Sequence, residues 1–418
     1  MAASSPALAF ATLVVLVLAL QFGPLVGLLG FRLTGNAQWA WNGLARDAAV
    51  ALLLAFAAGA WFNAPPRPPL PAGLRWALWM VATYAVLALL MASGGLVLTA
   101  INLRRLVLVP LLLVAVWVIP WTPRQVDQLF GVVVATSVVV AVFGLVEVVL
   151  PNRWWTEVLD IDAFTAANNL DRFGQLPFYE SGRYFTHDLQ ALTGGPVRRM
   201  ISTYLEPTTL AAGLATLLVV ALARRARGHA ATGLLVLALL AGLLTLSKGF
   251  AVFVAVLMAW RWLGAPGPQH ITVVLLLSCA AAAAADRFRL EGPFVHIAGL
   301  TSAMHYLFDG QWLGEGVGEA GNLSDLGSEV GEESGLGNVV AQVGWVALLS
   351  IFWLRALSRD VLTAARARRD PGGPWIAAWL LFWAVTYLFS ASSLGVGGNA
   401  LGFVVLALYL HPSSGRLR

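Results

Sequence analysis

Long apolar runs separated by short polar segments limit most strongly what this chain can fold into. A helix of about 20 apolar residues spans the hydrocarbon core of a bilayer, and runs near that length recur over all 418 residues. Because several runs are short, eleven to thirteen spans are possible, and we expect an all-α polytopic membrane protein with about twelve transmembrane helices. The predicted spans are 7–29, 47–62, 76–98, 106–121, 129–150, 207–223, 231–247, 249–263, 271–285, 338–357, 374–391 and 398–410.

The composition agrees with a membrane protein, since 59% of the residues are hydrophobic and only 11% are charged. An ordinary water-soluble enzyme of this length is thereby excluded. No Lys or Arg precedes the first run and no small-residue cleavage site closes it, so we expect a first span rather than a removed signal. No internal repeat is visible, which disfavours a transporter built from inverted repeats.

The arginines predict how the chain is threaded. Arg224, Arg225 and Arg227 form one cluster, and a second cluster lies between Arg355 and Arg369. Lys and Arg near helix ends are retained on the cytoplasmic side, so we expect both clusters and both termini inside a bacterial cytoplasmic membrane. The net charge of +5 then reflects topology, with membrane lipids and not a nucleic acid as the partner.

Two long polar segments fall outside the cytoplasm in this threading, and they hold most of the acidic residues. Loops carried on a rigid helical scaffold commonly hold functional residues. In the second loop, Ile297, Leu300, Met304, Leu307 and Phe308 recur at helical spacing and predict an amphipathic helix against the membrane surface or over a cavity. The expected parts are 1–150 with about five helices, the external loop 151–206, central helices 207–285, the external loop 286–337 and C-terminal helices 338–418.

The end of the first loop is the most informative stretch. Arg198 and Arg199 precede Glu206-Pro207, and Pro207 suits the first turn of the following helix. An arginine pair beside an acid at a membrane surface is costly unless it meets anionic groups, which a lipid diphosphate supplies. Contact with ordinary lipid headgroups is the alternative reading for both arginines. The paired indoles of Trp154 and Trp155, at the start of this loop, suit a membrane interface.

Several of these elements resemble the O-antigen polymerase and O-antigen ligase family. The segment 199–207 is similar to that family's R-x-x-G…P-N element, and Leu-Thr-Leu-Ser-Lys-Gly at 244–249 to its T-x-S-R-G element, with Lys248 in place of Arg. Leu-Gly-Glu-Gly-Val-Gly at 313–318 is similar to its P-L-G-x-G-x-G run. Glu333-Ser334 stands eleven residues before Gly344, where the ligases place His-Asn or His-Ser. The elements occur in the family's order over about 195–350.

The resemblance implies a membrane-embedded glycosyltransferase of the GT-C kind. Its donor and acceptor would be undecaprenyl-diphosphate-linked glycans, joined with inversion and without metal or other cofactor by an O-antigen or exopolysaccharide polymerase. A flippase and chain-length regulators would be partner proteins. A ligase that moves the glycan to a lipid or protein acceptor is one alternative. A transporter or flippase is another, although most charges lie at helix ends, with Glu147 the nearest exception.

The resemblance also assigns roles to cations. Arg199 and Lys248 are the first candidates to stabilise the charge that grows on the leaving diphosphate. Arg198 is a further candidate for substrate binding. Arg287 and Arg289, at the start of the second loop, are weaker candidates because membrane topology alone explains them.

A base must also take the proton of the acceptor hydroxyl. Glu333 stands where the ligases carry histidine, and this departure favours a polymerase over a ligase. Acids at a helix N-terminus also favour the helix dipole, which is the alternative explanation for Glu332 and Glu333. Glu206 is the rival base or orients Arg199.

Two histidines and one acidic pair complete the candidates. His296 and His305 are nine residues apart, so on a straight helix they point in opposite directions. His296-x-x-x-Leu300 resembles an R-x-x-x-L element of the ligases, so His296 either replaces a cationic substrate contact or is an ordinary polar flank. Asp160 and Asp162 have D-x-D spacing, but we interpret them as surface acids and expect no metal site.

Overall fold

The computed structural model describes residues 6–36, 43–63, 69–91, 95–167, 184–186, 189–229, 231–263, 295–318 and 334–414. Most of these residues are helical, so the all-α prediction is confirmed. Seven helices of the described part are long and apolar enough to cross a membrane, and three shorter apolar helices accompany them. The seven are Pro6–Thr34, Leu44–Asn63, Ala72–Leu90, Leu96–Val118, Pro123–Val149, Pro207–Ala226 and the helical stretch Gly335–Arg368, which is interrupted by a 3₁₀ turn.

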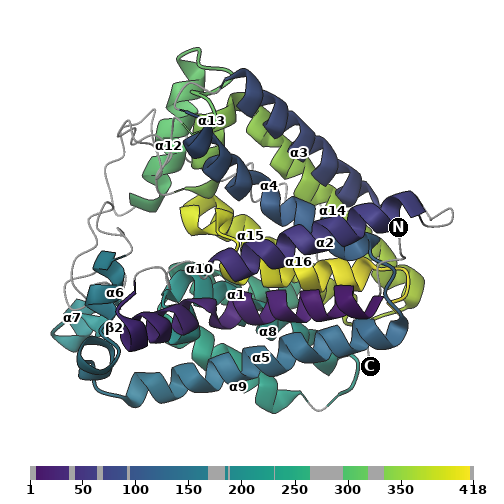
Figure 1. Ribbon diagram of the computed structural model, residues 1–418. Helices are drawn as coiled ribbons and strands as arrows, with labels where there is room; N and C mark the ends of the chain where they lie inside the picture. Colours follow the sequence, from purple (N-terminus) through teal and green to yellow (C-terminus); the bar gives the residue numbers. More distant parts are fainter. Residues whose placement is uncertain are drawn as a thin grey trace.

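The first part of the chain forms five long helices. α1 packs on α2 and α5, while α3 packs on α4 (Figure 1). The start of α5 shows why the chain turns there, because Thr122 and Gln125 cap the helix reciprocally and Pro123 occupies its first position. The bounds are α1 (Pro6–Thr34), α2 (Gly43–Asn63), α3 (Ala72–Leu90), α4 (Leu96–Val118) and α5 (Pro123–Val149).

The segment after α5 contains short elements at one end of the helices (Figure 1). A two-residue antiparallel pair joins β1 and β2, with Phe185 opposite Arg198 and Thr186 opposite Val197. The elements are a π-helical turn (Trp154–Val158), α6 (Ile161–Ala167), β1 (Phe185–Thr186), α7 (Gln190–Thr193), β2 (Val197–Arg198) and a 3₁₀ turn (Ser202–Tyr204).

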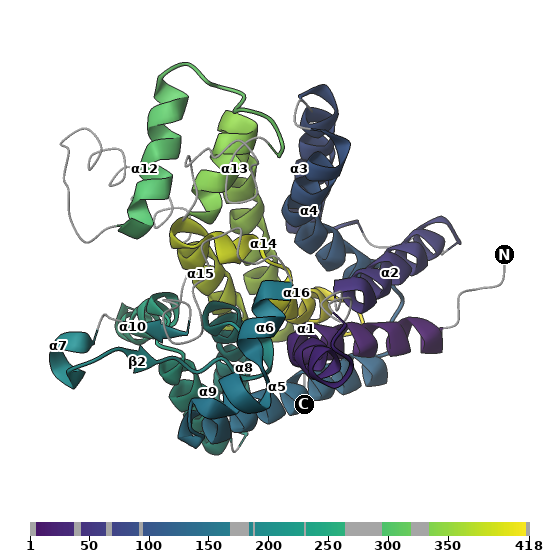
Figure 2. The same ribbon diagram turned by 60° about the vertical axis from the view of Figure 1, so that its left-hand side comes forward.

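The second half supplies the central helices of the bundle. α8 contacts α9, α15 and α16, and α14 contacts α3 and α15 (Figure 2). The bounds are α8 (Pro207–Ala226), α9 (Thr232–Leu244), α10 (Lys248–Leu263), α12 (Val295–Phe308), α13 (Gly335–Val343), a 3₁₀ turn (Gly344–Leu348), α14 (Leu349–Arg368), α15 (Gly373–Phe389), a 3₁₀ turn (Ala391–Leu394) and α16 (Gly397–Leu410).

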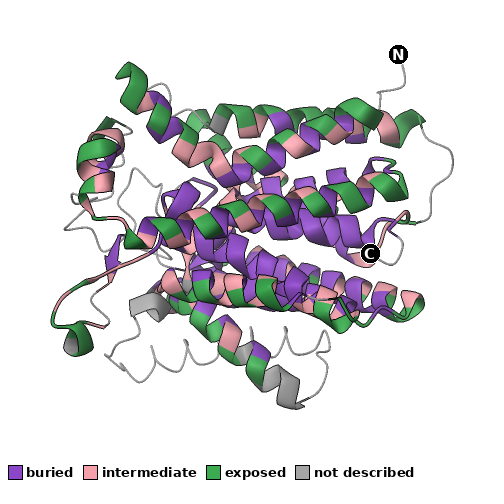
Figure 3. Cartoon of the chain, turned by 90° about the horizontal axis from the view of Figure 1, so that it is seen from below, coloured by how far each residue is buried: buried purple, intermediate pink, exposed green. Residues whose placement is uncertain are grey.

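Burial is greatest at the centre of the bundle. α16 is buried from Gly398 to Leu410, whereas the outer helices alternate buried and exposed residues (Figure 3). Their exposed faces carry large apolar side chains, including Val15, Leu18, Leu52, Trp79, Val139 and Val142. Exposing so much apolar surface to water is unfavourable, whereas the hydrocarbon of a bilayer covers it. The chain is accordingly a multi-pass membrane protein.

The two ends of the bundle differ in character. At one end, here called the Arg227 end, Pro6 accepts a hydrogen bond from Gln125 and His411 contacts the Ile119 carbonyl. Arg227, just after α8, pairs there with Asp370, just after α14. Both arginine clusters and both described chain ends therefore share one end, as the charge pattern predicts (Figure 1). The opposite end, where α8 begins, is called the Glu206 end.

One predicted span boundary is wrong in a way that matters for the site. The span expected at 106–121 is α4, which begins ten residues earlier, at Leu96. Asn102 hydrogen-bonds the Leu98 carbonyl within the helix, and Arg104 pairs with Asp47 of α2, so these polar residues are satisfied inside the helix. As a result Arg105 lies within α4 instead of in a loop. The expected span 271–285 falls outside the described residues.

Candidate functional site at the Glu206 end

The first residues of α8 and α16 are in contact. Gly397 and Gly398 lie against Thr209, so closely that a Cβ on Gly398 would overlap the Thr209 carbonyl oxygen. Pro207 occupies the first position of α8, as predicted. The two helices thus present their N-termini, each equivalent to about half a positive charge, side by side.

The first residues of α10 and α13 lie against the C-terminal part of α15. A Cβ on Gly249 would be 3.0 Å from Cγ2 of Thr386, and one on Gly335 would be 2.9 Å from Cδ2 of Tyr387. Thr386 and Tyr387 are consecutive, and α16 begins ten residues after Tyr387. Four helix N-termini therefore lie along the segment 386–397, which also contains the C-terminal end of α15, and helix N-termini favour anions.

The structure brings Arg199 and Lys248 close together, although they are far apart in sequence. Nε of Arg199 donates to the Thr245 carbonyl over 3.1 Å, and the neighbouring Met200 N–H donates to Leu244. Lys248 begins α10 three residues after Thr245 and is exposed. The two cations predicted to bind one diphosphate thus flank the same turn between α9 and α10.

Glu206 is held by the helix that it precedes. Its carboxylate accepts hydrogen bonds from the hydroxyls of Thr208 and Thr209, at 2.8 and 2.6 Å. It also attracts the guanidinium of Arg105 in α4. Both carboxylate oxygens already accept hydrogen bonds from hydroxyl groups. Glu206 is therefore better suited to orient a neighbouring cation than to take up a proton.

Arg198, another candidate, has a structural set of partners. Its guanidinium donates to the carbonyls of Glu147 and Val148 and to the Asn152 side chain at 2.6 to 2.9 Å. These contacts satisfy the carbonyls that the end of α5 leaves without helical partners. The geometry accounts for Arg198 without a substrate.

Glu147, the charge predicted deep in a span, anchors the first loop. Its carboxylate accepts from Nε1 of Trp155 at 3.2 Å and from the backbone N–H groups of Ile201 and Ser202 at 3.2 and 3.0 Å. Trp155 is fully buried by this contact. The expectation that Trp155 faces the membrane interface is therefore wrong, because its indole lies inside and donates a hydrogen bond to the buried Glu147 carboxylate.

The glycine-rich run 313–318 also has a structural explanation. The backbone N–H groups of Glu315 and Gly316 donate to the carbonyls of Ala341 and Gln342, at 2.8 and 3.2 Å. A Cβ on Gly344 would overlap the Trp312 carbonyl oxygen. The run is thus fastened to the C-terminal end of α13, so the glycine-rich run and Gly344, two parts of the family-like pattern, meet in space.

The predicted amphipathic helix of the second loop is α12, and this prediction is confirmed for most of its face. Leu300, Met304 and Leu307 are buried, whereas Phe308 is 67% exposed. His305 is on the outer side, where it pairs with Asp309 at 3.3 Å. His305 is thus turned away from the cations at the start of α10.

For four predicted site residues the structure describes no side chain. Glu333, Arg287 and Arg289 are outside the described residues, and α12 contains His296 without a described side chain. Ser334 is buried and caps α13, accepting a hydrogen bond from Gly337 N–H at 2.9 Å. Glu333 directly precedes this cap, so its role as a base stays a prediction.

A small, largely apolar cavity with a few polar groups, between α3, α4, α13, α14 and α15, was missed by the sequence reasoning. Its volume is about 30 Å³, and it is lined by Arg105 together with Met80, Tyr84, Leu106, Val109, Pro110, Val339, Ser350, Trp353, Trp383, Tyr387, Ser393 and Leu394. The Arg-Arg pair at 104–105 was the available signal. The expected spans 76–98 and 106–121 left this pair between two helices, and it was not considered as a site.

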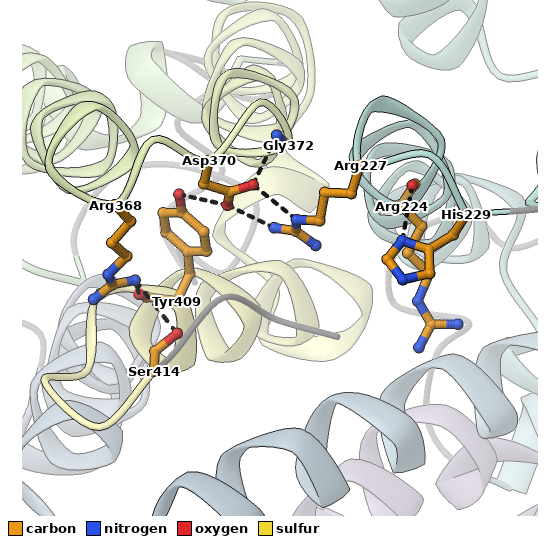
Figure 4. A network of polar contacts seen from close by, with 8 residues as sticks. All are labelled: Arg224, Arg227, His229, Arg368, Asp370, Gly372, Tyr409 and Ser414. Carbon is orange, nitrogen blue, oxygen red and sulfur yellow. Dashed lines mark hydrogen bonds and ion pairs between the residues drawn. The ribbon is translucent and has the colours of Figure 1, made fainter.

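The Arg227 end holds a second charged network, and its groups are satisfied by one another (Figure 4). Arg227 donates twice to Asp370, at 2.8 and 2.7 Å, and Asp370 also accepts from Tyr409 and from the N–H of Gly372. Burial raises the pKa of Asp370, but the hydrogen bonds from Arg227 and Gly372 outweigh it and lower the pKa below the ordinary value. This saturated network ties α8 to α14 and α16.

In comparisons with known proteins, no protein family matches the chain and no curated protein shows a significant match. Within the described ranges, no group of three or more His, Cys, Asp and Glu side chains could hold a metal ion. The site therefore has to be interpreted from its own chemistry.

Proposed function

We propose that the protein is a membrane-embedded glycosyltransferase that polymerises undecaprenyl-diphosphate-linked oligosaccharides on the outer face of a bacterial cytoplasmic membrane. The observation that carries this proposal is the group of four helix N-termini around 386–397, with Arg199 and Lys248 beside one of them. Such a concentration of positive charge at a membrane surface suits a lipid diphosphate.

The proposed reaction is a substitution at the anomeric carbon of the donor. An acceptor hydroxyl attacks C1, the bond from C1 to the diphosphate oxygen breaks, and the hydroxyl proton passes to a carboxylate, for which Glu333 is our candidate. Arg199 and Lys248 stabilise the negative charge that accumulates on the departing diphosphate. Glu206 helps to orient the cations of the site. The configuration at the anomeric carbon inverts.

A polymerase is favoured over a ligase by the residue at position 333, which is an acid in this chain and histidine in the ligases that it resembles. A transporter is less well supported. Glu147 of α5 and Arg227, just after α8, are engaged in fixed structural contacts with Ser202 and Asp370 and are not free to carry a substrate.

The test is turnover by purified protein in liposomes. Given an undecaprenyl-diphosphate oligosaccharide, the protein should release lipid diphosphate and lengthen the glycan. Arg199→Ala and Lys248→Ala should each lower the initial rate about 10²-fold or more, the usual effect of removing a group that stabilises transition-state charge. Arg225→Ala is the matched control, because Arg225 is an exposed cation in the last turn of α8, at the Arg227 end, and it should keep the wild-type rate.

Full activity in both variants would show that the two cations do not hold the diphosphate. Transfer of the intact glycan to a different acceptor would replace polymerase by ligase. Movement of the lipid-linked sugar across the bilayer without bond cleavage would replace the enzyme by a transporter.

A further inference from the structure

Arg105 is a cation deep in the bundle, nine residues into α4, and the described residues offer it no hydrogen bond or ion pair. Its neighbour Arg104 repels it, and Glu206 attracts it from a distance. An ionisable side chain at membrane depth faces a cavity or a partner and commonly marks a functional site. Here Arg105 lines the small cavity between α3, α4, α13, α14 and α15.

Three other groups in the same cavity lack partners among the described residues. These are the hydroxyls of Tyr84 and Ser393 and Nε1 of Trp353. The three residues are at most 2% exposed. Buried polar groups are nearly always hydrogen-bonded, so a cluster of unsatisfied ones calls for an explanation.

The chemistry of these groups defines their missing partner. A guanidinium and an indole N–H only donate hydrogen bonds, and the two hydroxyls can also donate. A partner must therefore bring several acceptor oxygens, and the charge of Arg105 requires that it be negative. A guanidinium matches the oxygens of phosphate in bidentate geometry.

We propose that this cavity is a binding site for a phosphate-type oxyanion, with Arg105 as its cation and Tyr84, Trp353 and Ser393 as neutral donors. The site is additional to the pair Arg199 and Lys248. It does not require glycosyl transfer, since binding alone defines it. The phosphate could belong to a lipid or be free in solution, and the two sources share this chemistry.

Binding has to open the cavity. A volume of about 30 Å³ holds about one water molecule, whereas a phosphate group has five heavy atoms. The 3₁₀ turn Ala391–Leu394 supplies Ser393 and Leu394 to the lining and is not part of a long helix. Displacement of this turn is the opening movement that we propose.

The experiment is equilibrium binding to the purified full-length protein, in the Arg199→Ala/Lys248→Ala background so that the first pair of cations does not contribute. The probes are radiolabelled inorganic diphosphate and geranylgeranyl diphosphate. We expect at least one probe to bind, and Arg105→Gln to weaken it about tenfold or more, as expected for a charge-assisted hydrogen bond. Arg104→Gln is the matched control, because Arg104 pairs with Asp47, and should bind as the parent does.

Tyr84→Phe and Ser393→Ala test the neutral donors without disturbing the fold. Each removes a hydroxyl without a partner among the described residues, so Tm without ligand should stay unchanged while the Kd rises several-fold. If Arg105→Gln fails to fold, these two variants decide. Equal affinity for both probes identifies free phosphate as the ligand, and binding of only the prenyl probe identifies a lipid phosphate.

The proposal is overturned if neither probe binds, if Arg105→Gln folds and binds like its parent, or if Arg104→Gln loses as much affinity as Arg105→Gln. A fall in Tm for Tyr84→Phe and Ser393→Ala with unchanged Kd also overturns it. The binding assay contains no sugar. If the protein binds a probe but does not polymerise glycans, the proposed function is wrong and the phosphate site still stands.

Discussion

Asp370 is the most completely satisfied charge described in the chain. Arg227 binds both of its oxygens, and the two side chains are only 3% and 9% exposed. Replacing one partner of such a pair leaves the other buried and uncompensated, which costs far more than the pair itself contributes.

We predict that Asp370→Asn lowers the free energy of unfolding by about 3–5 kcal/mol. The pKa of Asp370 is lowered in the folded protein, so its contribution is complete above about pH 5 and is lost as the pH falls through the ordinary aspartate value of about 3.9 toward the folded one. Wild-type Tm should therefore fall toward that of Asp370→Asn on acidification. Thermal unfolding in detergent from pH 7 to pH 3 measures this.

Asp309→Asn is the control for this prediction, because Asp309 is exposed in its pair with His305 and should leave Tm nearly unchanged at every pH. A constant difference between wild type and Asp370→Asn down to pH 3 would contradict the assignment of the lowered pKa.

Individual residues also show where sequence reasoning ends. Pro207 could be placed in the first turn of α8, because the N–H groups of a first turn have no partner within the helix and a proline loses no hydrogen bond there. Arg105 could not be found, because adjacent arginines look alike in sequence. Only the packing of α2 against α4 supplies Asp47 to Arg104 and leaves Arg105 turned inward.

Among the elements, the break between α13 and the following 3₁₀ turn is the most constrained. Gly344 has φ of 61° and ψ of −141°, a conformation open essentially to glycine. The carbonyl of Trp312 occupies the place of a Cβ and accepts a hydrogen bond from Trp345 N–H at 3.0 Å. The break thus fixes the glycine-rich run against α13.

We predict that Gly344→Ala destabilises the protein by more than about 2 kcal/mol, from backbone strain of about 1–3 kcal/mol together with the overlap. Gly310→Ala isolates the strain, because Gly310 also has a positive φ of 98° but open space around it. Denaturation of both variants in detergent measures the difference. Equal losses of stability would show that contact with Trp312 does not matter.

Helix existence was more predictable than helix boundaries. The paired runs 231–247 and 249–263 became α9 and α10, and the spacing at 297–308 became α12, because an apolar face of helical period has few alternatives. The start of α4 was not predictable. Its apolar run is interrupted by Arg104-Arg105, and the helix accommodates Arg104 through a salt bridge to Asp47 of another helix, which local sequence does not reveal.

For the whole molecule, the threading through the membrane is the main expectation to test. The described chain ends and both arginine clusters share the Arg227 end, while the described parts of the first loop lie at the Glu206 end (Figure 1). The positive-inside rule then orients the molecule with the Arg227 end in the cytoplasm.

We predict that, in a Cys279→Ser background, Leu192→Cys reacts with a membrane-impermeant maleimide in intact spheroplasts. Arg225→Cys should react only after permeabilisation. Both native side chains are exposed, so reactivity reports the side of the membrane and not burial. The reverse pattern would place Arg199 in the cytoplasm and remove the basis of the proposed function.

The contacts of Glu147 have a consequence for how the molecule is made. Its carboxylate depends on N–H groups 54 and 55 residues further along the chain. During synthesis this acid emerges from the ribosome long before its partners do, and an unpaired carboxylate does not settle in hydrocarbon. We therefore expect α5 to reach its final depth only after the ribosome has produced Ile201 and Ser202, so that insertion of this helix is completed together with the loop that follows it.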